Sequence, residues 1–212
     1  LPWELGLVEA HQTLIKNKLR QRVTIQADGQ IKTGRDIVIA TLLGAEEWGV
    51  ATSALVVSGC ILMRKCHLNT CPVGVATQNP ELRKKFKGNP EHLVNYFKFL
   101  ATEVRELMAN LGFRNIDEMV GQYQCLTKRE DLKHWKYQNI DLSLFLQKIE
   151  TELSLTKIEN QDNGLSNSLS WAMLEAGKEA IENGGTIETC LEIKNIDRAV
   201  GTILSHELTK KY

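Results

Sequence analysis

Length, composition and charge exclude several classes of protein. The chain has 212 residues, of which 42% are hydrophobic, and this suffices for one core or slightly more. Its 26 basic and 26 acidic residues balance, so charge gives no reason to expect nucleic acid as a partner.

The cysteines, the apolar segments and the two ends of the chain indicate the cellular compartment and whether the protein is longer than this chain. Three of the five cysteines lie close together, which fits a reducing compartment, so a cytoplasmic protein is expected. The apolar run over residues 50–63 is too short to span a membrane, and no membrane partner is expected. The chain starts at Leu1 without a signal-peptide pattern and stops at Tyr212 after a helical pattern. We therefore expect a part of a longer protein.

The first part of the chain predicts a strand–helix–strand unit. Thr33 is a candidate N-cap and Gly44 a candidate stop for the helix of this unit, and His11 lies on the apolar side of an earlier helix as a core residue. Two strands and a helix within about 30 residues make a βαβ unit with a right-handed crossover. The expected elements are a helix over residues 3–20, a strand over 22–27, a turn over 28–30, a helix over 34–43, a strand within 48–52 and a short helix over 53–60.

The second part of the chain predicts helices around a polar segment. Pro90 suits the first turn of a strongly periodic helix, and Gly112 suits its end. The polar residues 126–165 are expected to be a linker that wraps the surface. The other expected elements are a helix over residues 80–86, a helix over 90–111, a helical turn within 113–120, a helix over 170–183 and a strand over 186–193.

Three cysteines in the segment GCILMRKCHLNTCPVG are the most informative feature. Cys60, Cys66 and Cys71 have the spacing C-x5-C-x4-C, which lets their thiols converge on one inorganic centre with little loop-closure entropy. Structural zinc and four-iron clusters usually take four ligands, whereas three thiolates fit a [3Fe-4S] cluster. From the residues alone, buried core thiols and a disulfide remain open alternatives. His67 could complete a zinc site only with an awkward backbone.

Two glycine-containing turns are candidates for binding an anion. Each follows a predicted strand, and glycines let backbone N–H groups approach a phosphate while a helix N-terminus adds its dipole. In (β/α)8 barrels the loops after the last two strands often bind a phosphate, although most Asp-Gly pairs are ordinary turns. The candidate residues are Asp28, Gly29, Gln30, Lys32, Gly34, Gly49, Val50 and Ala51. Lys32 would supply the positive charge.

A basic run lies between the cysteines and the long helix. Lys84, Lys85 and Lys87 are its lysines, and Arg83 precedes them. Such runs are usually solvated faces. The alternative is that this charge docks an electron-donating partner or raises the potential of a nearby cluster.

The cysteine segment, extended to GCILMRKCHLNTCPVGVATQ, closely resembles the iron–sulfur segment of glutamate synthase large (alpha) subunits. The resemblance continues in LPWELGLVEAHQTL, ADGQIKTGRDIVIATLLGAEEWGVAT, NPEHLVNYFKFLATEVRELMANLGF and NIDRAVGTILSHELTKKY, and only residues 126–185 match loosely. It implies that Cys60, Cys66 and Cys71 ligate a [3Fe-4S] cluster beside FMN. It also implies that the two turns bind the FMN phosphate, with Gln30 replacing the second glycine of the Asp-Gly-Gly turn found in FMN-dependent barrels.

The resemblance implies an α/β fold and three regions. Residues 1–125 would be the C-terminal part of a (β/α)8 barrel, with its last two strands and helices and the iron–sulfur loop. Residues 126–185 would be a linker and connecting helix, and residues 186–212 would begin a further, β-rich domain.

The function implied by the resemblance is part of glutamate synthase activity. The whole enzyme would aminate 2-oxoglutarate reductively with ammonia from glutamine, electrons passing through [3Fe-4S] to FMN from a small subunit or ferredoxin. The expected location is the cytoplasm, or a plastid in a photosynthetic eukaryote, and this chain alone is expected to be inactive. The alternatives are a non-catalytic iron–sulfur or metal-binding electron-transfer module and a related FMN-barrel oxidoreductase with another substrate.

Overall fold

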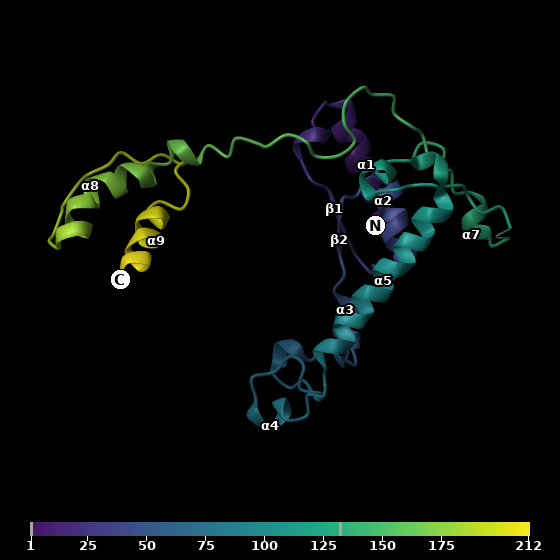
Figure 1. Ribbon diagram of the computed structural model, residues 1–212, viewed down its shortest axis with the longest axis horizontal. Helices are drawn as coiled ribbons and strands as arrows, with labels where there is room; N and C mark the ends of the chain where they lie inside the picture. The colour runs from purple at the N-terminus through teal and green to yellow at the C-terminus, as the bar shows by residue number, and fades with distance from the viewer. Residues whose placement is uncertain (1, 132) are drawn as a thin grey trace. The chain divides into compact units, whose positions relative to one another are not determined.

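The computed structural model describes residues 2–131 and 133–212, which form helices and a small parallel sheet (Figure 1). The chain divides into two compact units, one ending at Asn160 and the other running from Gln161 to Tyr212. The predicted α/β class is confirmed. None of the helices in the described ranges is long and apolar enough to cross a membrane.

The first unit carries most of the elements, and the second is helical. In chain order, with η denoting a 3-10 helix, the elements are α1 (Trp3–Lys16), η1 (Arg20–Arg22), β1 (Gln26–Asp28), α2 (Gly34–Leu42), β2 (Glu47–Gly49), α3 (Thr52–Val57), η2 (Cys66–Leu68), α4 (Pro80–Arg83), α5 (Pro90–Leu111), α6 (Ile116–Met119), η3 (Tyr123–Cys125), α7 (Trp135–Gln138), η4 (Leu165–Asn167), α8 (Leu169–Asn183) and α9 (Thr202–Lys211).

The predicted strand–helix–strand unit is present as β1, α2 and β2. The two strands pair in parallel, with Asp28 beside Gly49. The Thr33 hydroxyl accepts the Asp36 N–H and the Asp36 carboxylate accepts the Thr33 N–H, so the predicted N-cap is one half of a capping box. Both strands are shorter than predicted, because η1 precedes β1 and α3 begins three residues after β2.

The predicted first helix ends at Lys16 instead of continuing to residue 20. Lys18 then adopts a positive φ of 58°, and the chain turns into η1. This turn directs the Arg20 side chain into the interior, where only 1% of the residue is exposed. If the first helix continued to residue 20 as predicted, this turn between α1 and β1 would be absent.

The long helix α5 matches its predicted bounds and covers α2. It begins at Pro90 and ends before Gly112, which has a φ of 86° and closes the helix in the left-handed conformation. Its fully buried residues recur four apart, on one face that packs against α2, and they are Leu100, Val104 and Met108. This face and α2 form much of the core of the first unit.

The predicted linker packs against the first unit up to Asn160. The Gln12 side chain donates to the Leu144 carbonyl (3.0 Å), and the Ile158 N–H donates to the Gln21 carbonyl (2.9 Å). α7 is the only α-helix that the described part of residues 126–160 contains. The segment up to Asn160 is therefore part of the first compact unit.

The second unit corrects one prediction. Residues 186–193 were expected to form a strand, but the structure has no strand there. A strand needs a neighbouring backbone to complete its hydrogen-bond ladder. Here the segment is flanked by the helices α8 and α9, which pack on each other, so it remains an exposed loop. The predicted helix before it is confirmed, and Gly184 ends it.

Candidate cysteine and anion-binding site

The three clustered cysteines lie between α3 and α4 (Figure 1). Cys60 is half-buried, Cys66 is exposed and Cys71 is buried, and all three are free thiols. The chain between them takes positive φ angles at Leu62 (56°) and Arg64 (53°). Residues other than glycine adopt such angles rarely, so this loop has a special backbone course.

The backbone after Cys71 affects the ionisation of its thiol. The N–H of Ala76 contributes most to lowering the pKa of the Cys71 thiol below its usual value, and those of Val73, Val75 and Gly74 add to it. Backbone amides near a sulfur favour the thiolate, which is the form that ligates metals.

A cavity of about 680 Å³ opens beside Cys66. Arg83, Phe86 and residues 74–78 line it together with Cys66. A basic residue and one of the three cysteines therefore border the same space.

The donor chemistry fits an iron–sulfur cluster, whereas the arrangement does not already form a metal site. Three thiols within twelve residues, one of them with a lowered pKa, are typical ligands of such a cluster. Among the residues that the structure describes, no group of three or more His, Cys, Asp or Glu side chains is gathered to hold a metal ion. Holding a cluster would therefore require Cys60 and Cys66 to move towards Cys71.

The two predicted anion-binding turns lie side by side at the ends of β1 and β2. Asp28 and Gly49 are register partners, and a Cβ on Gly49 would lie 2.8 Å from the Asp28 carboxylate. Gly29 has a φ of 120° and donates its N–H to the Asp28 side chain (2.6 Å). Gln30 also adopts a positive φ, 65°, so the backbone keeps the left-handed turn although glycine is absent there.

The N-terminal amides of α2 are already engaged. The Asp36 carboxylate accepts the N–H groups of Lys32 and Thr33, both at 3.0 Å. The Gly34 N–H donates to the Glu103 carboxylate at 2.7 Å. The start of α2 was predicted to add its dipole to the phosphate site, and these three N–H groups are paired with carboxylates of the chain itself.

The remaining predicted anion-binding residues stay accessible. The Lys32 side chain and Ala51 are exposed, and Val50 is half-buried directly after β2. Together with Gly49 they lie at the carboxyl end of the paired strands, where α/β proteins generally bind their ligands.

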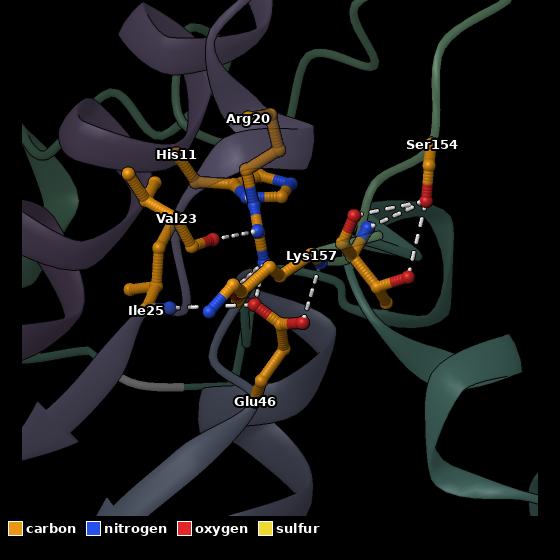
Figure 2. A network of polar contacts seen from close by, with 9 residues as sticks. His11, Arg20, Val23, Ile25, Glu46, Ser154 and Lys157 are labelled. Atoms are coloured by element: carbon orange, nitrogen blue, oxygen red, sulfur yellow. Dashed lines mark hydrogen bonds and ion pairs between the residues drawn. The ribbon is translucent and has the colours of Figure 1, made fainter. Parts of the chain in front are cut away.

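The first unit contains a buried polar network around Arg20, which Figure 2 shows. Sequence reasoning did not predict this network. Arg20 donates to His11 Nδ1 (2.8 Å) and to the Glu46 carboxylate (2.7 Å). Glu46 also accepts the N–H groups of Ile25 and Lys157, so it joins segments that are distant in sequence. Burial, with the charge of Arg20 beside it, lowers the pKa of His11 to about 3. Only the burial of His11 was predictable.

Comparison with known proteins places these features in a family. A family model described as a conserved region in glutamate synthase matches residues 1–114, which include both turns and all three clustered cysteines. The large chain of glutamate synthase [NADPH] from Bacillus subtilis (strain 168) is 53% identical over 213 residues, which cover 100% of this chain and 14% of the relative. Glutamate synthase [NADH] from Schizosaccharomyces pombe is 50% identical over 215 residues, covering 100% of this chain and 10% of that protein.

Ferredoxin-dependent relatives match over the same extent. Ferredoxin-dependent glutamate synthase 2 from Synechocystis sp. is 42% identical over 214 residues, covering 100% of this chain and 14% of the relative. The chain thus spans a small part of the length of the curated relatives it matches. Since the family match covers more than half of its residues, the chain belongs to the glutamate synthase family.

Proposed function

We propose that this chain is the part of a glutamate synthase large subunit that holds its iron–sulfur cluster and one side of its flavin site. The whole enzyme would aminate 2-oxoglutarate reductively with ammonia from glutamine and so form glutamate. The observation that carries this proposal is the C-x5-C-x4-C segment of Cys60, Cys66 and Cys71, which lies inside the family match.

Cys60, Cys66 and Cys71 would hold a [3Fe-4S] cluster. The backbone N–H groups near Cys71 lower the pKa of its thiol and so favour the thiolate, and the accessible Cys66 lines a cavity. When bound, the cluster supplies one-electron transfer and FMN supplies hydride transfer. Arg83, on the same cavity, would stabilise added negative charge there.

FMN would bind with its phosphate at the ends of β1 and β2. Lys32 supplies a positive charge, and the backbone of Gly49, Val50 and Ala51 supplies N–H donors, while Asp28, Gly29 and Gln30 shape the opposite turn. In this proposal β1 and β2 are the last two strands of a (β/α)8 barrel. Gly34 belongs to the same loop and begins α2, with its N–H donated to the Glu103 carboxylate.

The electron donor would be a small subunit or ferredoxin. Relatives named for NADPH, NADH and ferredoxin all match the whole chain, at 53%, 50% and 42% identity. The segment is therefore shared by enzymes with different donors. It supports the common chemistry and not one choice of donor.

The proposal is tested by glutamate formation in the full-length enzyme. Replacing Cys66→Ser should reduce synthesis from glutamine and 2-oxoglutarate to background, because one of three ligands is lost. Cys125→Ser, at a half-buried cysteine outside the cluster segment, serves as the matched control and should retain activity. Wild-type synthesis by the Cys66→Ser enzyme would exclude the cluster from the reaction.

A further inference from the structure

The loop between β1 and α2, residues 29–33, is held by side chains from outside it. The Tyr96 hydroxyl on α5 donates to the Lys32 carbonyl (2.8 Å), and the Asp36 carboxylate accepts the Lys32 N–H (3.0 Å). Both backbone groups of Lys32 are therefore fixed. The direction in which its side chain leaves the backbone is set before any ligand arrives.

A second contact from α5 holds the end of this loop. The Glu103 carboxylate accepts the Gly34 N–H at 2.7 Å. The two helices approach so closely here that a Cβ on Gly34 would lie 2.8 Å from Glu103 Cβ and from the Val104 nitrogen. The first amide of α2 is therefore already paired before a ligand arrives.

Resting on the flavin site proposed above, we propose that Tyr96 and Glu103 are positioning residues for the FMN phosphate. Tyr96 fixes the backbone of Lys32, and Glu103 closes the α2 start, so that the phosphate is directed to Lys32 and to the amides after β2. A loop held in its binding conformation loses less entropy when the ligand binds. Without these contacts the loop must be ordered by FMN itself, and affinity falls.

This proposal makes α5 the link between the two cofactor regions. α5 begins at Pro90, shortly after the cysteine segment and α4. It carries both Tyr96 and Glu103. α3, which leads into Cys60, adds a third contact, since the Ser53 hydroxyl donates to the Ile31 carbonyl (3.3 Å). The elements that border the cysteines thus also hold the anion-binding loop.

The test is flavin affinity of the full-length apoenzyme, measured by quenching of flavin fluorescence, for FMN and for riboflavin, which lacks the phosphate. Tyr96→Phe and Glu103→Ala should each weaken FMN binding about three- to tenfold, the effect of one lost hydrogen bond. Riboflavin binding and iron content should not change. Glu103→Gln retains an oxygen acceptor for the Gly34 N–H and should stay within about twofold of wild type.

Matched controls come from exposed residues of the same types. Tyr137→Phe on α7 and Glu106→Ala on the exposed side of α5 should leave both affinities unchanged. Unchanged FMN affinity in the Tyr96 and Glu103 variants overturns the positioning role, and so does an equal loss of FMN and riboflavin, which would mean general disruption. Lys32→Glu separates the two proposals: if it too leaves FMN binding unchanged, the phosphate site itself is wrong.

Discussion

Arg20 brings a positive charge into the interior of the first unit and finds four acceptors there. Its guanidinium donates to the His11 ring, to the carbonyls of Val23 and Gly44, and to the Glu46 carboxylate. Burying a charge is costly unless it is paired and hydrogen-bonded. This network satisfies Arg20 and ties together α1, β1, the start of β2 and the segment near Lys157.

Removing the carboxylate at Glu46 tests this network. Glu46→Ala leaves Arg20 buried without its counter-charge, so the free energy of unfolding of the chain should fall by about 3 kcal/mol. The control is Glu81→Ala, which breaks the exposed ion pair with Lys84. The two side chains are 70% (Lys84) and 77% (Glu81) exposed, so this substitution should change the free energy of unfolding little. Urea unfolding followed by circular dichroism measures both. Equal losses in the two variants would contradict the buried role.

His11 predicts a pH dependence of stability. Its pKa is about 3 in the folded chain, against about 6.5 when unfolded. Below about pH 6.5 the unfolded state binds a proton that the folded state refuses, so stability falls by roughly 1 kcal/mol per pH unit towards acid. His11→Asn should reduce this slope between pH 7 and pH 5, as measured by urea midpoints. A variant with the same slope as wild type would show that His11 does not titrate on unfolding.

At the scale of elements, local signals predicted the helices well. α5 carries its own start at Pro90 and its own stop at Gly112, and α2 carries the cap at Thr33. These features act within a few residues, so the sequence displays them. The prediction of a strand over residues 186–193 was wrong. A strand needs a partner strand that can be distant in sequence, and a local pattern of residues does not show whether that partner is present.

The candidate site was predictable to a similar extent. The spacing of the cysteines is a local feature, so the sequence shows it. With the resemblance to the family, it predicted the iron–sulfur segment. The contact of Glu103 with Gly34 joins residues 69 positions apart, so sequence reasoning did not reveal it. The lowered pKa of Cys71 depends on backbone N–H groups of residues 73–76 and not on their side chains, so residue types could not reveal it.

The basic run Arg83–Lys87 can be tested as an electron-donor surface. All its lysines are exposed, and Lys84 already pairs with Glu81, which favours a solvated face. Charge reversal of Lys84, Lys85 and Lys87 in the full-length enzyme should therefore leave reduction by the physiological donor unchanged. A defect that shrinks at high salt, and is absent with a small artificial donor, would instead identify a docking surface.

At the scale of the whole molecule, the chain corresponds to a small part of its much longer relatives. The first unit contains the family match up to residue 114, both anion-binding turns and the cysteine segment. Its relatives are seven- to tenfold longer, since the chain covers 14% and 10% of them. Two paired strands leave open edges, which isolated sheets rarely tolerate, so activity is expected only in the full-length protein.

The most direct test of the account is the iron and acid-labile sulfide content of the full-length protein, purified without oxygen. The account predicts the ratio of a [3Fe-4S] cluster, lost on replacing Cys60→Ser, Cys66→Ser or Cys71→Ser and retained in Cys125→Ser. A cluster with three protein ligands has none to spare. Zinc in place of iron, or iron that persists in any of the three variants, would contradict it.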